Sequence, residues 1–76
     1  MPNEEEFPMD SVTSSNILQI GYSNGAVRVV FVSRPEVTYE YSGVSQNDYD
    51  IIRNSPSLGS AVNKFLVRGP YSSRKL

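Results

Sequence analysis

The chain has 76 residues, of which 38% are hydrophobic, and a formal net charge of -1. This length allows one domain with a thin core, and the near-neutral charge argues against a general nucleic-acid binder, which is usually strongly basic. The sequence contains no Cys and no His, which excludes disulfides, thiolate or imidazole metal sites and the most common general base. We therefore expect no cofactor, no metal site and no enzymatic activity.

The charges are distributed unevenly along the chain. The first ten residues carry acids and no base, whereas no acid follows Asp50. Residues 1–9 also contain two prolines and show no apolar periodicity, so we expect a flexible acidic arm in which Phe7 could act as an anchor. The acidic N-terminus and the lack of a long apolar run predict a soluble, cytoplasmic protein without a signal peptide or membrane helix.

A β-hairpin is predicted for residues 16–33. Two stretches rich in β-branched and aromatic residues flank Asn24-Gly25, the dipeptide that most strongly favours a two-residue type I′ turn. Such a turn places Ser23 opposite Ala26 and so fixes the register. The expected core face then consists of Leu18, Ile20, Tyr22, Val27, Val29 and Phe31. The opposite face would hold Ile17, Gln19, Gly21, Arg28, Val30 and Val32.

A third strand is predicted for Val37–Ser42, after a turn at Arg34-Pro35-Glu36. The length of this turn decides which face Tyr39 and Tyr41 occupy, because side chains alternate along a strand. A three-residue loop places both tyrosines on the core face, whereas a loop of two or four residues places them on the opposite face. Burial is favoured because large rings contribute most when they are buried, but the sequence leaves both registers open.

Two helices are predicted after the strands. Ser45–Asp48 has the form of a capping box, and this helix should run to about Asn54. Ser55-Pro56 is typical of a second helix start, and Gly69-Pro70 should end that helix. Gly59 inside it indicates a close approach of another segment. The apolar stripe of the second helix consists of Leu58, Ala61, Val62, Phe65 and Leu66.

These elements predict an α+β domain. We expect a three-stranded antiparallel β-meander followed by two short helices packed on one face of the sheet. The domain should span residues 10–71, and residues 72–76 should form a basic tail.

With these elements in place, the chain resembles the KTSC domain family, a small module named for the C-terminus of some lysyl-tRNA synthetases. The family also occurs as stand-alone proteins in bacteria and phages, and it has no established activity. RNA binding has been suggested for it mainly from the synthetase context. The resemblance covers nearly all of residues 10–75. The matching residues are Ser14, Ser15, Asn16, Ile17, Ile20, Gly21, Tyr22, Val29, Phe31, Tyr39, Glu40, Tyr41, Val44, Ser57, Gly59, Phe65, Arg68 and Tyr71.

The first functional hypothesis is a non-catalytic interaction module, such as a bacterial or phage accessory protein, that binds another protein or a second copy of itself. It is based on the apolar cluster expected on the second sheet face. The interface would consist of Ile17, Gln19, Arg28, Val30 and Val32. The alternative is that the N-terminal arm covers this face, with Phe7 lying over it.

The second hypothesis is an accessory module that binds RNA or another single-stranded nucleic acid. Unpaired bases would stack on Tyr39 and Tyr41, and basic side chains would contact phosphates. These basic side chains are Arg28, Lys64, Arg68, Arg74 and Lys75. The competing interpretation is that the tyrosines belong to the core and that the basic residues form a solvated tail. We expect neither reading to involve a membrane.

Overall fold

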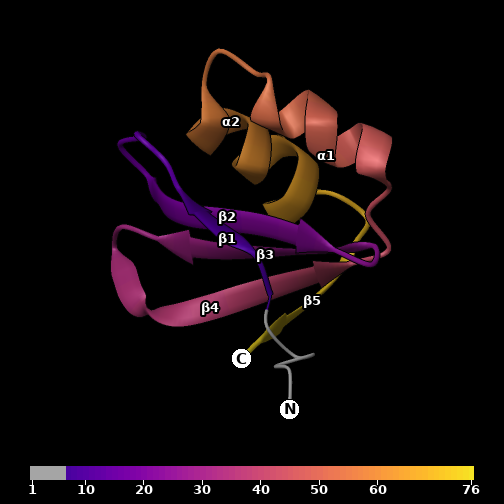
Figure 1. Cartoon of the computed structure of the whole chain (residues 1–76), viewed down its shortest axis with the longest axis horizontal. Helices are drawn as coiled ribbons and strands as arrows, with labels where there is room; N and C mark the ends of the chain where they lie inside the picture. The colour runs from indigo at the N-terminus through magenta and orange to yellow at the C-terminus, as the bar shows by residue number, and fades with distance from the viewer. Residues whose placement is uncertain (1–6) are drawn as a thin grey trace.

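The computed structural model describes residues 7–76 and shows one antiparallel sheet covered on one side by helices (Figure 1). The five strands lie in chain order, β1-β2-β3-β4-β5, and the helices are inserted between β4 and β5. The expected acidic arm falls largely on residues 1–6, outside the described residues. The elements are β1 (Met9–Ser11), β2 (Ile17–Ser23), β3 (Ala26–Phe31), β4 (Arg34–Ser42), α1 (Gln46–Arg53), α2 (Leu58–Val62), the π-helix η1 (Asn63–Val67) and β5 (Ser72–Lys75).

The hairpin of β2 and β3 forms around Asn24-Gly25 as predicted. The φ angles of these two residues are 51° and 79°, which is the backbone that a type I′ turn requires. Ser23 pairs with Ala26, and the register predicted from the turn holds as far as Gln19 opposite Val30.

Beyond Gln19 the predicted register is wrong, because β2 contains a bulge. Gln19 pairs with Val30 and Ile17 pairs with Phe31, so Leu18 is an extra residue in β2. A bulge interrupts the alternation of side chains along a strand. As a result Ile17 is 0% exposed in the core, whereas Leu18, which we expected in the core, is 42% exposed.

The turn before β4 also differs from the prediction. Val32 and Ser33 form the turn, and Arg34-Pro35-Glu36, which was expected to form it, already belongs to β4. Phe31 pairs with Arg34, after which β4 has four residues where β3 has one. This irregular section accommodates Pro35, whose missing N–H would interrupt a regular ladder.

The two tyrosines of β4 nevertheless lie on the face that a three-residue loop predicts. Tyr39 pairs with Val29 and Tyr41 with Val27, so both side chains share the core face with these valines. The ring of Tyr39 meets that of Phe31 edge-on, with 5.7 Å between the centroids. The extra residues of β4 thus change the residues with which the tyrosines pair, but both tyrosines stay on the core face.

The first helix begins and ends as predicted. The hydroxyl of Ser45 accepts a hydrogen bond from the backbone N–H of Asp48 at 3.1 Å, and Asn54 is the C-cap. The carboxylate of Asp48 accepts a 2.6 Å hydrogen bond from the hydroxyl of Tyr71. The cap therefore also ties α1 to the segment that leads into β5.

The second helix begins two residues later than predicted. Ser57, not Ser55, is its N-cap and accepts from the N–H of Ser60. After α2 the helix widens into η1, where the N–H of Arg68 bonds to the carbonyl of Asn63, five residues earlier. The wider turn rotates the predicted stripe, so Leu66 is buried while Phe65 is exposed.

The sheet has five strands and not the predicted three. The added strands are the outermost ones: β1 pairs with β2, and β5 pairs with β4. Both are short, and the four residues of β5 are all polar and exposed, so neither strand has the apolar alternation by which a strand is found in a sequence.

The core lies between the sheet and the helices. Among the described residues, no helix has both the length and the apolar character needed to cross a bilayer. The buried hydrophobic side chains of the core cluster are Ile17, Ile20, Val27, Val29, Tyr41, Val44, Tyr49, Ile52, Ala61, Val62 and Leu66.

Candidate functional site

The tyrosine pair does not form an open platform for bases. Tyr41 is 5% exposed in the core, and Tyr39 is half-buried against Phe31. Burial raises the pKa of Tyr41, because the charged phenolate is disfavoured away from water. The competing interpretation, that the tyrosines belong to the core, is correct for Tyr41. A base could reach its ring only if the helices moved.

The helix-free face of the sheet is centred on a buried carboxylate, Glu40. Its Oε2 accepts from Nε of Arg28 and its Oε1 from Nε of Arg74, each at 2.9 Å. The three residues are cross-strand neighbours on β3, β4 and β5. The hydrogen bond from Arg28, reinforced by the one from Arg74, lowers the pKa of Glu40 despite the opposing effect of burial.

The N-terminal segment covers part of this face. The ring of Phe7 lies 4.2 Å below the guanidinium carbon of Arg28, a cation–π distance. Pro8 runs so close to Gly21 that a Cβ at that position would collide with the Pro8 carbonyl oxygen. Val30, on the same face, is only 6% exposed. The described part of the arm thus lies over this face, with Phe7 placed as the alternative interpretation expected.

The five predicted interface residues are therefore not brought together on one open surface. The prediction that Ile17 belongs to this interface is wrong, because the bulge places Ile17 in the core beneath the helices. Val32 is exposed, but in the turn before β4. Gln19, Arg28 and Val30 remain on the helix-free face, around a hollow of about 350 Å³ that Phe7 and Leu76 also line.

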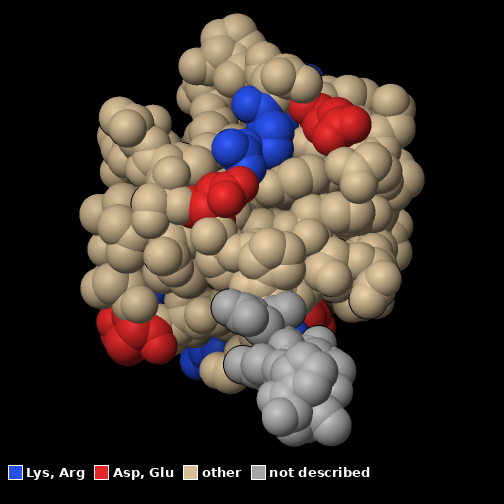
Figure 2. All heavy atoms as spheres, in the orientation of Figure 1, with Lys and Arg blue, Asp and Glu red and all other residues tan. Residues whose placement is uncertain are grey.

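The predicted phosphate-binding side chains are also dispersed. Arg28 and Arg74 share Glu40, whereas Lys64 belongs to η1, Arg68 caps its C-terminus and Lys75 lies on the edge strand β5. On the face drawn in Figure 2, basic and acidic side chains adjoin each other among uncharged surface, and no broad basic area appears.

Arg53, which the sequence analysis did not assign to a site, forms a network of its own. Its guanidinium donates to Asp10 Oδ2 and to the Tyr49 hydroxyl, each at 3.0 Å. The hydrogen bonds to Tyr49 and Asp10 raise the pKa of Arg53 further. This network connects the end of α1 to β1. Arg53 is thus a further basic side chain of the described residues that already has an acidic partner within the protein.

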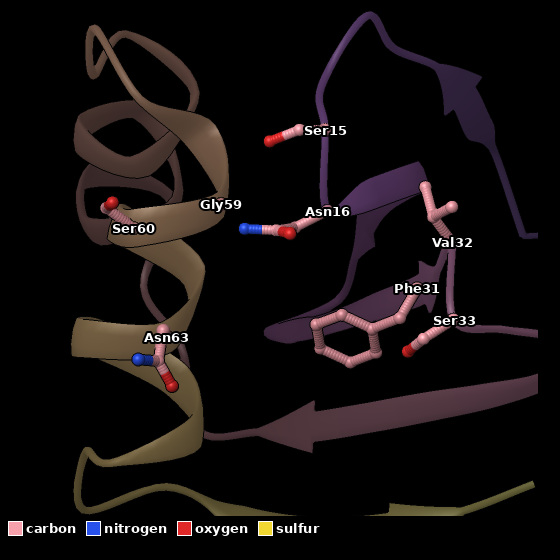
Figure 3. Close-up of a pocket in the computed structure, with 8 residues that line it drawn as sticks. All are labelled: Ser15, Asn16, Phe31, Val32, Ser33, Gly59, Ser60 and Asn63. Atoms are coloured by element: carbon pink, nitrogen blue, oxygen red, sulfur yellow. The ribbon is translucent and has the colours of Figure 1, made fainter.

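A groove with uncharged walls lies between the start of β2, the turn before β4 and the second helix (Figure 3). Its volume is about 400 Å³. We call it the polar groove. It is lined by Ser15, Asn16, Phe31, Val32, Ser33, Gly59, Ser60 and Asn63.

Local structure fixes one wall of the polar groove. The hydroxyl of Ser14 accepts from the backbone N–H groups of Asn16 and Ile17, each at 3.2 Å. The carbonyl of Asn16 accepts from the N–H of Val32 at 2.9 Å, which joins the start of β2 to the turn before β4. The Ser14 turn and this bond orient the Asn16 side chain towards the helix.

Gly59 allows the opposite wall to approach. A Cβ at position 59 would lie 2.8 Å from Nδ2 of Asn16, and Figure 3 shows the Asn16 amide pointing at this glycine. The close approach expected at Gly59 is therefore made by a side chain. Sequence reasoning noted Gly59 and the Ser-Ser-Asn run separately, but nothing in the sequence showed that they meet.

The lining of the polar groove offers hydrogen bonds and apolar contact but no titratable side chain. In the described part of the chain no cluster of three or more acidic, His or Cys side chains could hold a metal ion. The eight residues that line the groove include none of the acids, bases or activated nucleophiles that enzymes use most.

Comparison with known proteins identifies the family. The model of the KTSC domain matches residues 13–69. The chain belongs to the KTSC domain family. A crystal structure of a KTSC domain protein from Yersinia pestis is similar to this KTSC domain, with a TM-score of 0.78 and 29% sequence identity. The match covers 93% of this chain and 99% of the Yersinia chain. Among curated proteins the comparison finds no match.

Proposed function

We propose that this KTSC domain is a non-catalytic binding module that acts through contacts with another protein. The observation that supports this is the polar groove, a concave surface whose eight lining residues offer amides, hydroxyls and apolar contacts. Its volume falls within the range of about 300–1,000 Å³ that is common for binding pockets. A groove without a titratable side chain binds more readily than it catalyses.

The nucleic-acid alternative receives less support from the geometry. Stacking requires accessible rings, and Tyr41 lies in the core. Phosphate binding requires basic side chains that are not already neutralised, and Arg28 and Arg74 both donate to Glu40. A partner recognised by uncharged side chains agrees better with the formal net charge of -1.

Affinity capture with matched variants tests the proposal. The immobilised wild-type chain, Asn63→Arg and Asn47→Arg are each incubated with a lysate of the producing cells. Asn63 lines the groove, whereas Asn47 is an exposed residue of α1 outside it. We expect at least one protein to be retained by the wild type and by Asn47→Arg and lost from Asn63→Arg, because a long charged side chain should block the groove.

Two further measurements separate this proposal from its competitors. Light scattering on the purified chain shows whether the retained protein is a second copy of the chain itself. Titration of a labelled single-stranded RNA at low and moderate salt should show no salt-dependent binding. Salt-dependent RNA binding together with no retained protein would refute the proposal.

A further inference from the structure

The polar groove carries two carboxamides on opposite walls. Asn16 projects from the start of β2, and Asn63 projects from the first position of η1 (Figure 3). Each carboxamide has one acceptor oxygen and two donor hydrogens. Within residues 7–76, none of the side-chain hydrogen bonds of the structure uses either of these amides. Both are exposed, so a ligand can replace the water that bonds to them.

The chemistry of these amides matches that of a peptide backbone. Each residue of a peptide also presents one N–H donor and one C=O acceptor, and in an extended chain both point to the same side, so a single carboxamide can bond to both. Successive residues of an extended chain point these groups to opposite sides. Two carboxamides from facing walls can therefore hold neighbouring residues of a segment that runs between them. The hydroxyls of Ser15 and Ser33 add donors and acceptors along the same groove.

The lack of charged side chains and the apolar part of the groove further limit which ligands fit it. None of the eight lining side chains is charged, so a phosphate or a carboxylate would enter without a cation to stabilise it. Val32 is exposed, and Phe31 is half-buried because it packs against the core and Tyr39. This surface suits a small apolar side chain better than a sugar ring, which stacks on an open aromatic face.

Building on the proposed function, we propose that the polar groove binds an extended, uncharged peptide segment of a partner protein. Asn16 and Asn63 hold the peptide backbone from the two walls. Phe31 and Val32 contact one small apolar side chain of that segment. Gly59 is required because any side chain there would displace the Asn16 amide.

Selection from a phage-displayed library of linear heptapeptides tests this inference. The wild-type chain should enrich peptides whose central residues are uncharged and include a small apolar side chain. The enriched peptides are synthesised with blocked ends, and their affinities are measured by calorimetry. Amide shifts in a nitrogen-15 NMR spectrum should be confined to the groove and its neighbours.

Three variants make the test specific. Asn63→Asp removes the two donor hydrogens and adds a negative charge, so we expect affinity to fall at least about tenfold, the usual effect of leaving a peptide carbonyl without its donor. Asn47→Asp makes the same chemical change outside the groove and should alter affinity less than about twofold. Gly59→Ala moves the Asn16 amide and should weaken binding about tenfold while the melting temperature is kept.

Several outcomes would overturn the inference. These are a library without enriched peptides, enriched peptides that are charged at their centre, or equal affinity for wild type and Asn63→Asp. Binding of maltotriose with dependence on Asn63, and of no peptide, would assign the groove to a carbohydrate. If a protein is captured equally by the wild type and Asn63→Arg, this peptide site is wrong while protein binding itself stands.

Discussion

Replacing Glu40 with Gln should destabilise the protein strongly, although the two side chains have nearly the same shape. The carboxylate joins three neighbouring strands, because its two oxygens each accept from a different arginine. A Gln side chain has one oxygen and one NH₂ group. It can therefore accept from Arg28 or from Arg74, and its NH₂ group then faces the donors of the other.

The size of the effect follows from the exposure of the two arginines. The bond from Arg28 is partly buried, and a hydrogen bond to a charged group contributes about 1.5–3 kcal/mol. The side chain of Arg74 is 68% exposed, so its ion pair is screened by water and adds only about 0.2–1 kcal/mol. We expect Glu40→Gln to lower the free energy of unfolding by about 2–3 kcal/mol. For a domain of this size that corresponds to a melting temperature lower by roughly 10–20 °C.

Thermal unfolding followed by circular dichroism at several pH values measures both the size and the cause. The fold lowers the pKa of Glu40 from the ordinary value of 4.5, so its stabilising effect is present above that value. The effect is lost as the pH falls through the lower pKa of the folded state. The difference between wild type and Glu40→Gln should therefore be full at pH 7 and should shrink in acid below about pH 4.5.

Glu36→Gln is the matched control, since Glu36 is an exposed acid on the same strand. It should change the free energy of unfolding by less than about 0.5 kcal/mol. A loss for Glu40→Gln below about 0.5 kcal/mol, or a loss that is equally large at pH 7 and pH 3, would show that the two arginines do not depend on this carboxylate.

The bulge, the Tyr71 hydrogen bond and the covering of Gly21 each lead to a further prediction. Ile17→Ala should lower the free energy of unfolding, measured with denaturant, by about 2–5 kcal/mol because it empties a core position. Leu18→Ala should lower it by less than about 1 kcal/mol. The reverse order would show that β2 has no bulge and keeps the regular register. Tyr71→Phe removes the hydroxyl that donates to Asp48 and should cost about 1–2 kcal/mol. That bond raises the pKa of Tyr71, so the stabilisation by its hydroxyl should be full below about pH 10. It should disappear as the pH rises through the higher pKa of the folded state, and the absorbance of the phenolate follows this titration. Gly21→Ala should speed amide exchange in β1, because the new methyl group displaces the segment that crosses it; unchanged exchange would mean that this segment does not lie there.

Features set by neighbouring residues could be predicted from the sequence. Asn24-Gly25 determines its own backbone conformation, and with it the register of the nearest pairs of the hairpin. Ser45 caps α1 through an atom of its own side chain, three residues from the N–H that it binds. Such signals depend on a few adjacent residues, so they act whatever the rest of the chain does.

Features that depend on distant segments could not be predicted. The bulge at Leu18 places Ile17 beneath the helices, and its advantage appears only when those helices are present. The same holds for η1, in which Leu66 is buried in the core while Phe65 is exposed. The polar groove is the clearest case, since Asn16 and Gly59 are 43 positions apart in the sequence and meet only in the folded chain.

The order of the strands has a consequence for how the domain can be shortened. The family match ends at residues 13 and 69, whereas the outer strands of the sheet are residues 9–11 and 72–75. A chain trimmed to the matched residues would keep the core but lose both outer strands. It would present the long backbones of β2 and β4 at the new edges, and open edges of this kind pair readily with other chains. The two short outer strands therefore protect the edges of β2 and β4 from aggregation. A shortened form should precipitate at concentrations where the full chain stays monodisperse.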